Sequence, residues 1–384
     1  MGLIPALGDL GWTSEVHAPA EAGTDGRAIE RLPASFKTFR ARYPYLGLDA
    51  QRRARMVASG GNLVSPGELL ALLRSPGAHV LHAHTLGRLG GVVRTAARLR
   101  RIPYAVTLHG PVRANAAIVR EDAAVRTRGL VDLGAPFGWA VGARRVVQDA
   151  DMVFALNVGE RDAWRADRGA KHLELVVHGV DPTPASHGAR AEARALAGEG
   201  PFALVVARLD RNKGQDVALE AFARGAPQDL RLVFAGAPVD EGFAASLRAR
   251  AEALGGRVRI LGGVTPRIAR ALMAESEIVL APSRAEPFGI VLLEAWAEGA
   301  AVLFSAVDGL ADIARRVGVE RGLVPPGDVD SWTLRLRAAL ADAAWLDEEH
   351  RSAHARVVAN YTWASLARHT VRAYQEASIS RKAA

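Results

Sequence analysis

Residues 278–305 read IVLAPSRAEPFGIVLLEAWAEGAAVLFS, and this stretch decides the fold. Four apolar residues open it, and a loop of small and polar residues follows. A second apolar run, with the composition of a helix, begins at Ile290, and a third run from Ala301 to Phe304 closes the stretch. A strand, a loop, a helix and a second strand in this order predict a βαβ unit, which belongs to a parallel sheet.

Short apolar runs of the same kind recur along the whole chain. They are rich in Val, Leu and Ile, as buried parallel strands are, and longer stretches with helical periodicity separate them. Residues 178–200, rich in proline, glycine and small polar residues, divide the runs into two series. We therefore predict an α/β fold of two Rossmann-like domains, with the boundary between residues 181 and 182. The predicted strands are 79–82, 104–108, 152–156 and 175–177 in the first domain, and 202–207, 232–235, 258–261, 278–281 and 301–304 in the second.

The composition is that of an ordinary globular protein of 384 residues, of which 23% are charged. The formal net charge of +8 comes from scattered arginines that do not cluster with aromatic residues, so we expect no nucleic-acid partner. Cysteine is absent, which excludes disulfides and thiolate metal sites and agrees with a cytoplasmic location. The first residues lack the features of a signal peptide, and no apolar run reaches the length of about 18 residues that a membrane-spanning helix needs.

Two glutamates flank the turn between the strand and the helix of residues 278–305. Glu286 lies in the loop, and Glu294 follows eight residues later, about two turns inside the predicted helix. Pro287 and Gly289 predict a tight turn, after which backbone N–H groups and the positive end of the helix dipole point at the same place. This arrangement predicts an anion-binding site. Either glutamate alone is also compatible with an ordinary solvent-exposed side chain.

A second candidate anion site follows the predicted strand 202–207. Arg208 and Lys213 bracket a turn there, and Gly214 comes next. A planar guanidinium and a mobile ammonium group together suit a diphosphate. Basic residues are common in surface loops, but this chain has only four lysines, and ligands of open parallel sheets bind at the carboxyl ends of the strands. We therefore favour a phosphate-binding role for both side chains.

The complete pattern resembles the retaining glycosyltransferases of the GT-B fold, family 4, whose hallmark is this E-x7-E element. The resemblance implies two Rossmann-like domains that face each other across a cleft. In the family the first glutamate contacts hydroxyl groups of the donor sugar and the second holds the ribose, which implies these roles for Glu286 and Glu294. The backbone at Phe288, Gly289 and Ile290 would then face the distal phosphate and the sugar.

Further motifs carry the same resemblance, over about residues 75 to 376. The family uses an arginine and a lysine with the spacing of Arg208 and Lys213 to bind the donor pyrophosphate. Residues 322–328, GLVPPGD, match a late loop of the family. In relatives the last helix returns to the first domain. The implied division is an acceptor-side domain 1–181, a nucleotide-sugar domain 182–362, and a crossover helix with a tail, 363–384.

Histidines end two predicted strands of the first domain, in His82-Ala83-His84 and in Thr107-Leu108-His109-Gly110. The second motif resembles the one whose histidine approaches the donor sugar in the family, so His109 is the candidate for contacting the sugar or the reaction centre. A strand-end histidine that is hydrogen-bonded to backbone is the alternative. No cluster of Asp, Glu or Cys completes a metal-ligand set with these histidines, so we expect no metal site.

Two segments of the first domain depart from the family pattern. Residues 4–11 look like a remnant of its glycine-rich loop, and the helix that normally follows is missing. We expect a shortened start, in which residues 14–17 already form the second strand. A long insertion, 111–149, is expected to be a solvated helix pair that covers the sheet. Acceptor binding, or peripheral contact with an anionic membrane at its inner face, is the other interpretation of the insertion.

The sequence thus predicts a metal-independent, retaining glycosyltransferase that needs no cofactor and takes its sugar from a nucleotide diphosphate. Arg208, Lys213 and the helix N-terminus near Gly289 would stabilise the charge of the leaving diphosphate, and Glu286 and His109 complete the candidate catalytic set. The acceptor stays open among glycans, lipid-linked compounds and small natural products. The main alternative is a catalytically silent nucleotide-sugar-binding protein, because the start of the first domain departs from the family. A glycosyl phosphorylase and a membrane-associated scaffold are further alternatives.

Overall fold

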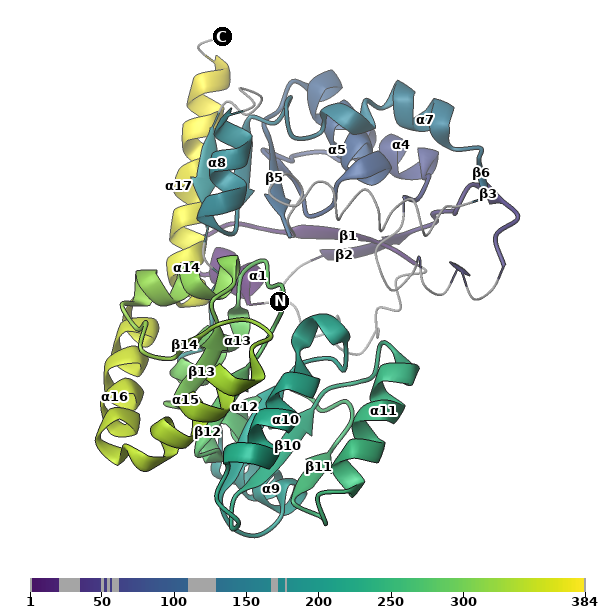
Figure 1. Cartoon of the computed structure of the whole chain (residues 1–384). Helices are drawn as coiled ribbons and strands as arrows, with labels where there is room; N and C mark the ends of the chain where they lie inside the picture. The colour runs from purple at the N-terminus through teal and green to yellow at the C-terminus, as the bar shows by residue number, and fades with distance from the viewer. Residues whose placement is uncertain are drawn as a thin grey trace. The chain divides into compact units, whose positions relative to one another are not determined.

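The computed structural model describes residues 2–20, 35–49, 52–53, 56, 62–109, 129–166, 172–176 and 178–382. The chain is divided into two compact units (Figure 1). The first comprises Met1–Val177 together with Trp363–Ala384, and the second comprises His178–Thr362. The first division falls between residues 177 and 178, where the sequence suggested 181 and 182. The last helix, α17 (Trp363–Lys382), packs within the first unit.

The second unit is built on a six-stranded parallel sheet with the strand order β11-β10-β9-β12-β13-β14. The chain moves outward from β9 to one edge, returns to the centre at β12, and then moves out to the other edge. The predicted strands of this domain are all present, and the two-residue β14 is an addition that was too short to be seen in the sequence. The strands are β9 (Phe202–Val206), β10 (Arg231–Ala235), β11 (Val258–Ile260), β12 (Ile278–Ala281), β13 (Val302–Ser305) and β14 (Leu323–Val324).

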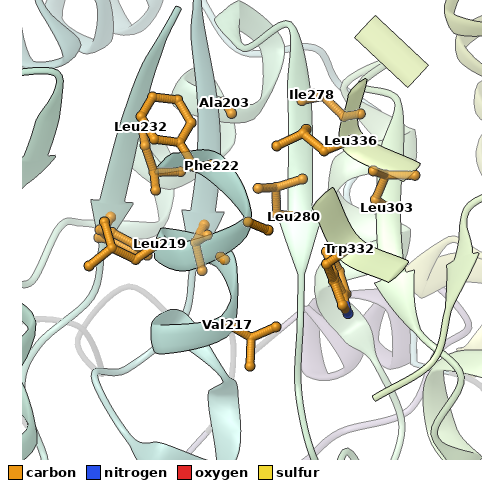
Figure 2. Packing of buried hydrophobic residues seen from close by; sticks show 14 of the residues in the cluster. Ala203, Val217, Leu219, Phe222, Leu232, Ile278, Leu280, Leu303, Trp332 and Leu336 are labelled. Atoms are coloured by element: carbon orange, nitrogen blue, oxygen red, sulfur yellow. The ribbon is translucent and has the colours of Figure 1, made fainter. Parts of the chain in front are cut away.

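Both faces of this sheet are covered by packed side chains. Figure 2 shows the core on one face, in which Ala203 of β9 packs with Phe222 of α10 and Trp332 of α15. The alternate residues Leu204 and Val233, which point to the opposite face, are also fully buried. The helices of the unit are α9 (His187–Ala197), η2 (Arg211–Lys213, a 3-10 turn), α10 (Gln215–Gly225), α11 (Glu241–Glu252), α12 (Pro266–Glu275), α13 (Ile290–Ala297), α14 (Asp308–Val317), α15 (Val329–Ala341) and α16 (Ala343–Asn360).

The first unit contains a four-stranded parallel sheet with the order β4-β5-β7-β8. Val106 of β5 packs in one cluster with Ala97 of α5, whereas its neighbour Ala105 packs in another with Tyr374 of α17. Successive strand residues point to opposite faces, so α5 and α17 lie on opposite sides of this sheet. Its elements are α4 (Pro66–Arg74), β4 (Leu81–Ala83), α5 (Gly87–Arg100), β5 (Tyr104–Leu108), β7 (Met152–Ala155), α8 (Val158–Ala166) and β8 (Leu173–Leu175).

The start of the chain differs from the expected loop remnant. Residues Leu3–Gly8 form a helix, α1, which buries Ala6 and Leu7 against Ala367 of α17. The prediction of a loop was wrong because the apolar side chains of this segment gain more by packing on α17 than by remaining in a solvated turn. The strand expected at residues 14–17 is present as β1 (Glu15–Pro19), which pairs in parallel with β2 (Ser35–Phe39) in a separate two-stranded sheet.

A histidine ties β1 to α4. The Nδ1 atom of His17 lies 2.7 Å from a carboxylate oxygen of Glu68, and its Nε2 atom lies 2.6 Å from a carboxylate oxygen of Glu15. The hydrogen bond to Glu68, and then the one to Glu15, raise the pKa of His17 above its usual value against the opposing effect of burial. The charged imidazolium is therefore favoured in the folded protein.

Part of the predicted insertion, residues 111–128, lies outside the described residues. The remainder forms β6 (Val131–Asp132), α7 (Ala135–Ala140) and the 3-10 turn η1 (Ala143–Arg145). Strand β6 pairs antiparallel with β3 (Tyr45–Leu46). Trp139 on α7 is 89% exposed, which leaves an apolar side chain in contact with solvent.

Candidate active site

The topology of the second unit places a ligand site between β9 and β12. These strands are hydrogen-bonded neighbours, and the strand order reverses between them. Ligands of open parallel sheets bind beyond the carboxyl ends of the strands at such a reversal. A cavity of about 230 Å³ lies at this place. It is lined by Val205, Val206, Ala207, Arg208, Lys213, Leu280, Ala281, Pro282, Ser283, Glu286, Ile290, Val291 and Glu294.

The cavity brings together five of the residues that the sequence singled out, namely Arg208, Lys213, Glu286, Ile290 and Glu294. Arg208 and Lys213 come from the segment after β9, and the other three come from the segment after β12 and from α13. The cavity therefore combines two cationic side chains, two carboxyl groups and the first residue of a helix. It has the charge pattern of a site for a polar, anionic ligand.

An ion pair joins the two segments inside the cavity. The Nζ atom of Lys213 lies 2.6 Å from Oε2 of Glu286, and the two side chains are 21% and 14% exposed. The Glu286 carboxylate holds the ammonium group of Lys213 at the cavity wall. Since a carboxylate and a phosphate are both oxyanions, a phosphate oxygen of a ligand can replace the carboxylate as the partner of Lys213. The Arg208 side chain is exposed and lines the same cavity.

The backbone around Lys213 has little freedom. The Asp210 carboxylate accepts a hydrogen bond of 2.8 Å from the backbone N–H of Asn212 and so begins the turn η2. Gly214 follows with a φ of +68°, and a Cβ atom there would lie 2.0 Å from the carbonyl oxygen of Pro282. Only glycine permits this approach. The segment that carries Lys213 is consequently pressed against the loop that carries Glu286.

Arg284, which the sequence did not indicate, joins the loop after β12 to the segment after β9. Its guanidinium donates two hydrogen bonds, of 2.8 and 2.9 Å, to the two carboxylate oxygens of Asp216. Its backbone N–H donates to the carbonyl of Asn212 at 2.7 Å. Burial opposes the charge of Asp216, but Arg284 holds the pKa of this carboxyl below its usual value. A bidentate arginine–carboxylate pair fixes orientation as well as distance, so the cavity wall has a defined shape.

The predicted turn before α13 is present, and Gly289 begins the helix with a φ of +89°. The backbone N–H of Gly309 donates to the carbonyl of Glu286 at 3.1 Å, and a Cβ atom on Gly309 would lie 2.3 Å from that oxygen. Phe288 is buried and packs edge-on against His178, with 4.9 Å between ring centroids. Phe288 and Gly289 therefore shape the turn without lining the cavity, whereas Ile290 lines it.

Glu294 is the fifth residue of α13 and so lies little more than one turn inside the helix, where the sequence suggested two. The predicted helix start at Ile290 is confirmed, and only the expected depth of Glu294 was wrong, because five residues span little more than one turn of about 3.6 residues. Burial raises the pKa of Glu294, and the positive charge of Arg270 opposes this effect. A carboxyl group with a raised pKa at a cavity wall is suited to hydrogen bonding with hydroxyl groups.

His109 belongs to the first unit and directly follows β5. Its Nε2 atom lies 2.9 Å from Nδ1 of His84, which directly follows the neighbouring strand β4. Burial lowers the pKa of His109. The contact with His84 was not foreseen, although the two histidines follow strands that the sequence already placed in one sheet.

Three small residues complete the cavity and were missed in the sequence. Ala207, Pro282 and Ser283 follow β9 and β12, and Ser283 is only 4% exposed although it lines the cavity. The sequence feature that could have indicated these three residues is the absence of large apolar side chains at the two strand ends, which leaves room for a ligand. In the described part of the chain, no group of three or more His, Cys, Asp and Glu side chains could hold a metal ion. None of the described helices is long and apolar enough to span a membrane.

Comparison with known protein families identifies the class of protein to which this chain belongs. The model of the group 1 glycosyl transferases matches residues 190–356, and that of the glycosyl transferase 4-like domain matches residues 1–181. The chain is 34% identical over 306 residues to D-inositol 3-phosphate glycosyltransferase 1 of Catenulispora acidiphila, which covers 73% of this chain and 68% of the relative. The chain therefore belongs to the group 1 glycosyl transferases, family 4, and is a glycosyltransferase.

Other relatives and solved structures agree with this assignment. D-inositol 3-phosphate glycosyltransferase of Corynebacterium kroppenstedtii is 26% identical, over 97% of this chain and 82% of the relative. Anabaena Alr3699/HepE, solved in complex with UDP and glucose, is 17% identical and matches with a TM-score of 0.71 over 98% of this chain and 95% of its own. Sucrose-phosphate synthase of Thermosynechococcus elongatus is 22% identical, with a TM-score of 0.69 over 97% and 91%. The structural likeness establishes the GT-B fold.

Proposed function

We propose that this glycosyltransferase takes a sugar from a nucleoside diphosphate and transfers it to an acceptor hydroxyl with retention of anomeric configuration. The observation that carries the proposal is the cavity between β9 and β12. It presents Arg208, Lys213 and the N-terminus of α13 beside two carboxyl groups. Cations and a helix N-terminus suit the diphosphate, and carboxyl oxygens suit the hydroxyl groups of ribose and sugar.

The proposed chemistry follows from this charge distribution. The bond between C1 of the sugar and the distal phosphate oxygen breaks, the acceptor oxygen forms a new bond to C1, and a phosphate oxygen receives the acceptor proton. Negative charge grows on the leaving diphosphate, where Arg208, Lys213 and the helix dipole stabilise it. Because protein cations supply this charge, we propose that neither a metal ion nor a cofactor is needed. Glu286 would hold sugar hydroxyls and Glu294 the ribose, and His109 would contact the sugar.

The comparisons suggest which substrates to test first. Anabaena HepE was solved with UDP, so uridine diphosphate sugars are the first donors to examine. Relatives named D-inositol 3-phosphate glycosyltransferase make an inositol phosphate the first acceptor. We propose both only as classes, since pocket loops set specificity in a fold that hosts many activities.

A thermal-shift screen against UDP, GDP, ADP, CMP and dTDP sugars, with and without EDTA, tests the donor site. A ligand that binds only the folded chain raises the melting temperature. We expect a shift with one nucleotide class that EDTA does not abolish. Lys213→Ala and Arg208→Ala should each reduce it, whereas Arg248→Ala, a change at an arginine 48% exposed on α11, should not. Unchanged shifts in both cavity variants would contradict the proposal.

The stereochemistry of the product and the turnover of the donor test the two other parts of the proposal, namely retention and catalysis. With the donor class known, proton NMR of the product reports whether the anomeric configuration is retained, and inversion would refute that part. The alternative is a catalytically silent nucleotide-sugar-binding protein. It predicts a donor-induced shift but no release of free nucleotide, either by transfer across an acceptor panel that includes inositol phosphates or by slow hydrolysis of the donor.

A further inference from the structure

Three histidines gather at the carboxyl ends of two neighbouring strands in the first unit. His82 lies within β4, His84 follows it, and His109 follows β5. Parallel strands end at the same edge of a sheet, so these residues are adjacent although 25 residues separate His84 from His109. The ring of His82 stacks on that of His84, with 4.2 Å between centroids and 29° between planes.

The contact between His84 and His109 joins two ring nitrogens, Nδ1 and Nε2, at 2.9 Å. A hydrogen bond between two nitrogens requires a proton on one of them and a lone pair on the other. If His84 donates, the proton of neutral His109 resides on its Nδ1 atom, which can then act only as a donor. If His109 donates, its Nδ1 atom becomes an acceptor. The partner of one ring nitrogen thus decides the chemistry of the other.

The stack is anchored from the protein interior. The hydroxyl of Tyr374, a buried residue of α17, lies 2.5 Å from Nδ1 of His82, and the Thr107 hydroxyl lies 2.7 Å from Nε2. Burial, and then the neighbouring histidines, lower the pKa of His82 well below its usual value, so this ring stays neutral. Both of its nitrogens are engaged by hydroxyl groups. His82 therefore presents a fixed face for the ring of His84.

We propose that His84 is a positioning residue that sets the ring orientation and the tautomer of His109, and that Tyr374 holds His84 in place through His82. This assignment rests on the proposed function to the extent that His109 contacts the donor sugar. Loss of His84 removes the hydrogen bond to Nε2 of His109, and so changes the balance between the two tautomers of His109 and the orientation of its ring. Turnover would then fall because only a fraction of molecules carry the productive form, while binding of the nucleotide in the other unit would be unaffected.

The decisive measurement is the tautomer of His109, which needs no activity. Long-range proton–nitrogen NMR spectra of histidine-labelled protein distinguish the two ring nitrogens. We expect one dominant tautomer of His109 in the wild type and a mixture in His84→Ala. His84→Asn, whose amide takes the place of Nδ1, should restore most of the single form. An unchanged His109 spectrum and pH titration in His84→Ala would overturn the proposal.

Controls separate this proposal from general damage and from the proposed function. His79→Ala, at an exposed histidine just before β4, should leave the His109 signals unchanged. Tyr374→Phe, which removes only the hydroxyl, should change the signals of His82 and of His109, and an effect on His82 alone would remove Tyr374 from the assignment. In transfer assays His84→Ala should lose about tenfold in kcat with little change in donor KM. If the wild type transfers no sugar, the proposed function fails while the spectra still decide the role of His84.

Discussion

Replacing Glu286 by glutamine is expected to tighten the binding of a bare nucleoside diphosphate while slowing sugar transfer. Lys213 forms an ion pair with the Glu286 carboxylate at 2.6 Å. A diphosphate that takes this lysine has to displace the carboxylate and then lie beside its negative charge. Glutamine keeps the size of the side chain and removes the charge. The variant should therefore lack both the competing anion and the repulsion.

The solvent exposure of the Lys213–Glu286 pair determines how large the change in nucleotide affinity should be. With side chains 21% and 14% exposed, the pair lies between surface pairs, worth roughly 0.2–1 kcal/mol, and fully buried pairs, which cost about 3–5 kcal/mol to break. We expect a net gain of about 1 kcal/mol, or roughly fivefold in Kd. Transfer should fall by roughly 10- to 150-fold, because a hydrogen bond to a charged group is worth about 1.5–3 kcal/mol. The two effects have opposite signs.

Isothermal titration calorimetry with the nucleotide found in the thermal screen, alongside initial rates of transfer, measures both effects. The gain in affinity should shrink at high salt, because screening weakens partly exposed ion pairs. Glu241→Gln, the same change at a glutamate 75% exposed on α11, is the matched control and should alter neither quantity. Lys213→Gln should weaken nucleotide binding. If Glu286→Gln weakens it to the same extent, the carboxylate does not compete with the phosphate and the reasoning is refuted.

Three further predictions concern the backbone, the first unit and its surface. Gly214→Ala should destabilise the second unit by about 3 kcal/mol in urea unfolding and abolish nucleotide binding, because its Cβ would lie 2.0 Å from the Pro282 carbonyl oxygen at a positive φ. His17 has a raised pKa, so its contribution to stability is complete below pH 6.5 and is lost as the pH rises through the folded-state pKa. His17→Asn should therefore reduce the free energy of unfolding at pH 6 more than at pH 8.5; an equal loss at both would contradict the assignment. Trp139→Ala should reduce flotation with anionic vesicles, whereas Leu334→Ala, a change at another exposed apolar residue, should not; equal flotation of all forms would exclude this contact.

The second unit could be predicted almost completely because its strands are buried on both faces. Runs such as 278–281 contain only apolar residues, and Gly and Pro mark their ends, so the bounds of β12 agree with the sequence. In the first unit, the short strand β4 begins two residues after its predicted start and ends one residue after its predicted end, and β8 lies two residues before its predicted run. Their segments contain His and Glu, and the apolar residues beside them extend past the strand ends. There the periodicity does not distinguish strand from flanking loop.

The candidate site could be predicted as a set of residues but not as a set of contacts. Strand ends, a turn and a helix start indicated Lys213 and Glu286 separately, each as a ligand of the substrate. Their pairing joins residues 73 positions apart and depends on the reversal of strand order between β9 and β12. The same holds for Arg284, whose partner Asp216 lies on the helix after the other loop. Local patterns contain no information on such side-chain partners.

These internal contacts explain how a site for a highly charged ligand can be ordered before the ligand arrives. Two loops that carried only cations would repel each other and remain mobile, and ordering them would reduce the binding energy. Here the Glu286 carboxylate balances the charge of Lys213, and the bidentate pair of Arg284 with Asp216 joins the two loops. The proposed diphosphate would therefore exchange one anion for another at a wall that already has its shape. Displacement of the ion pair makes binding weaker. Because the two loops are already ordered, binding does not have to overcome the entropy of ordering them. This is why removal of the Glu286 charge should improve nucleotide affinity, whereas breaking the Arg284–Asp216 pair should reduce it.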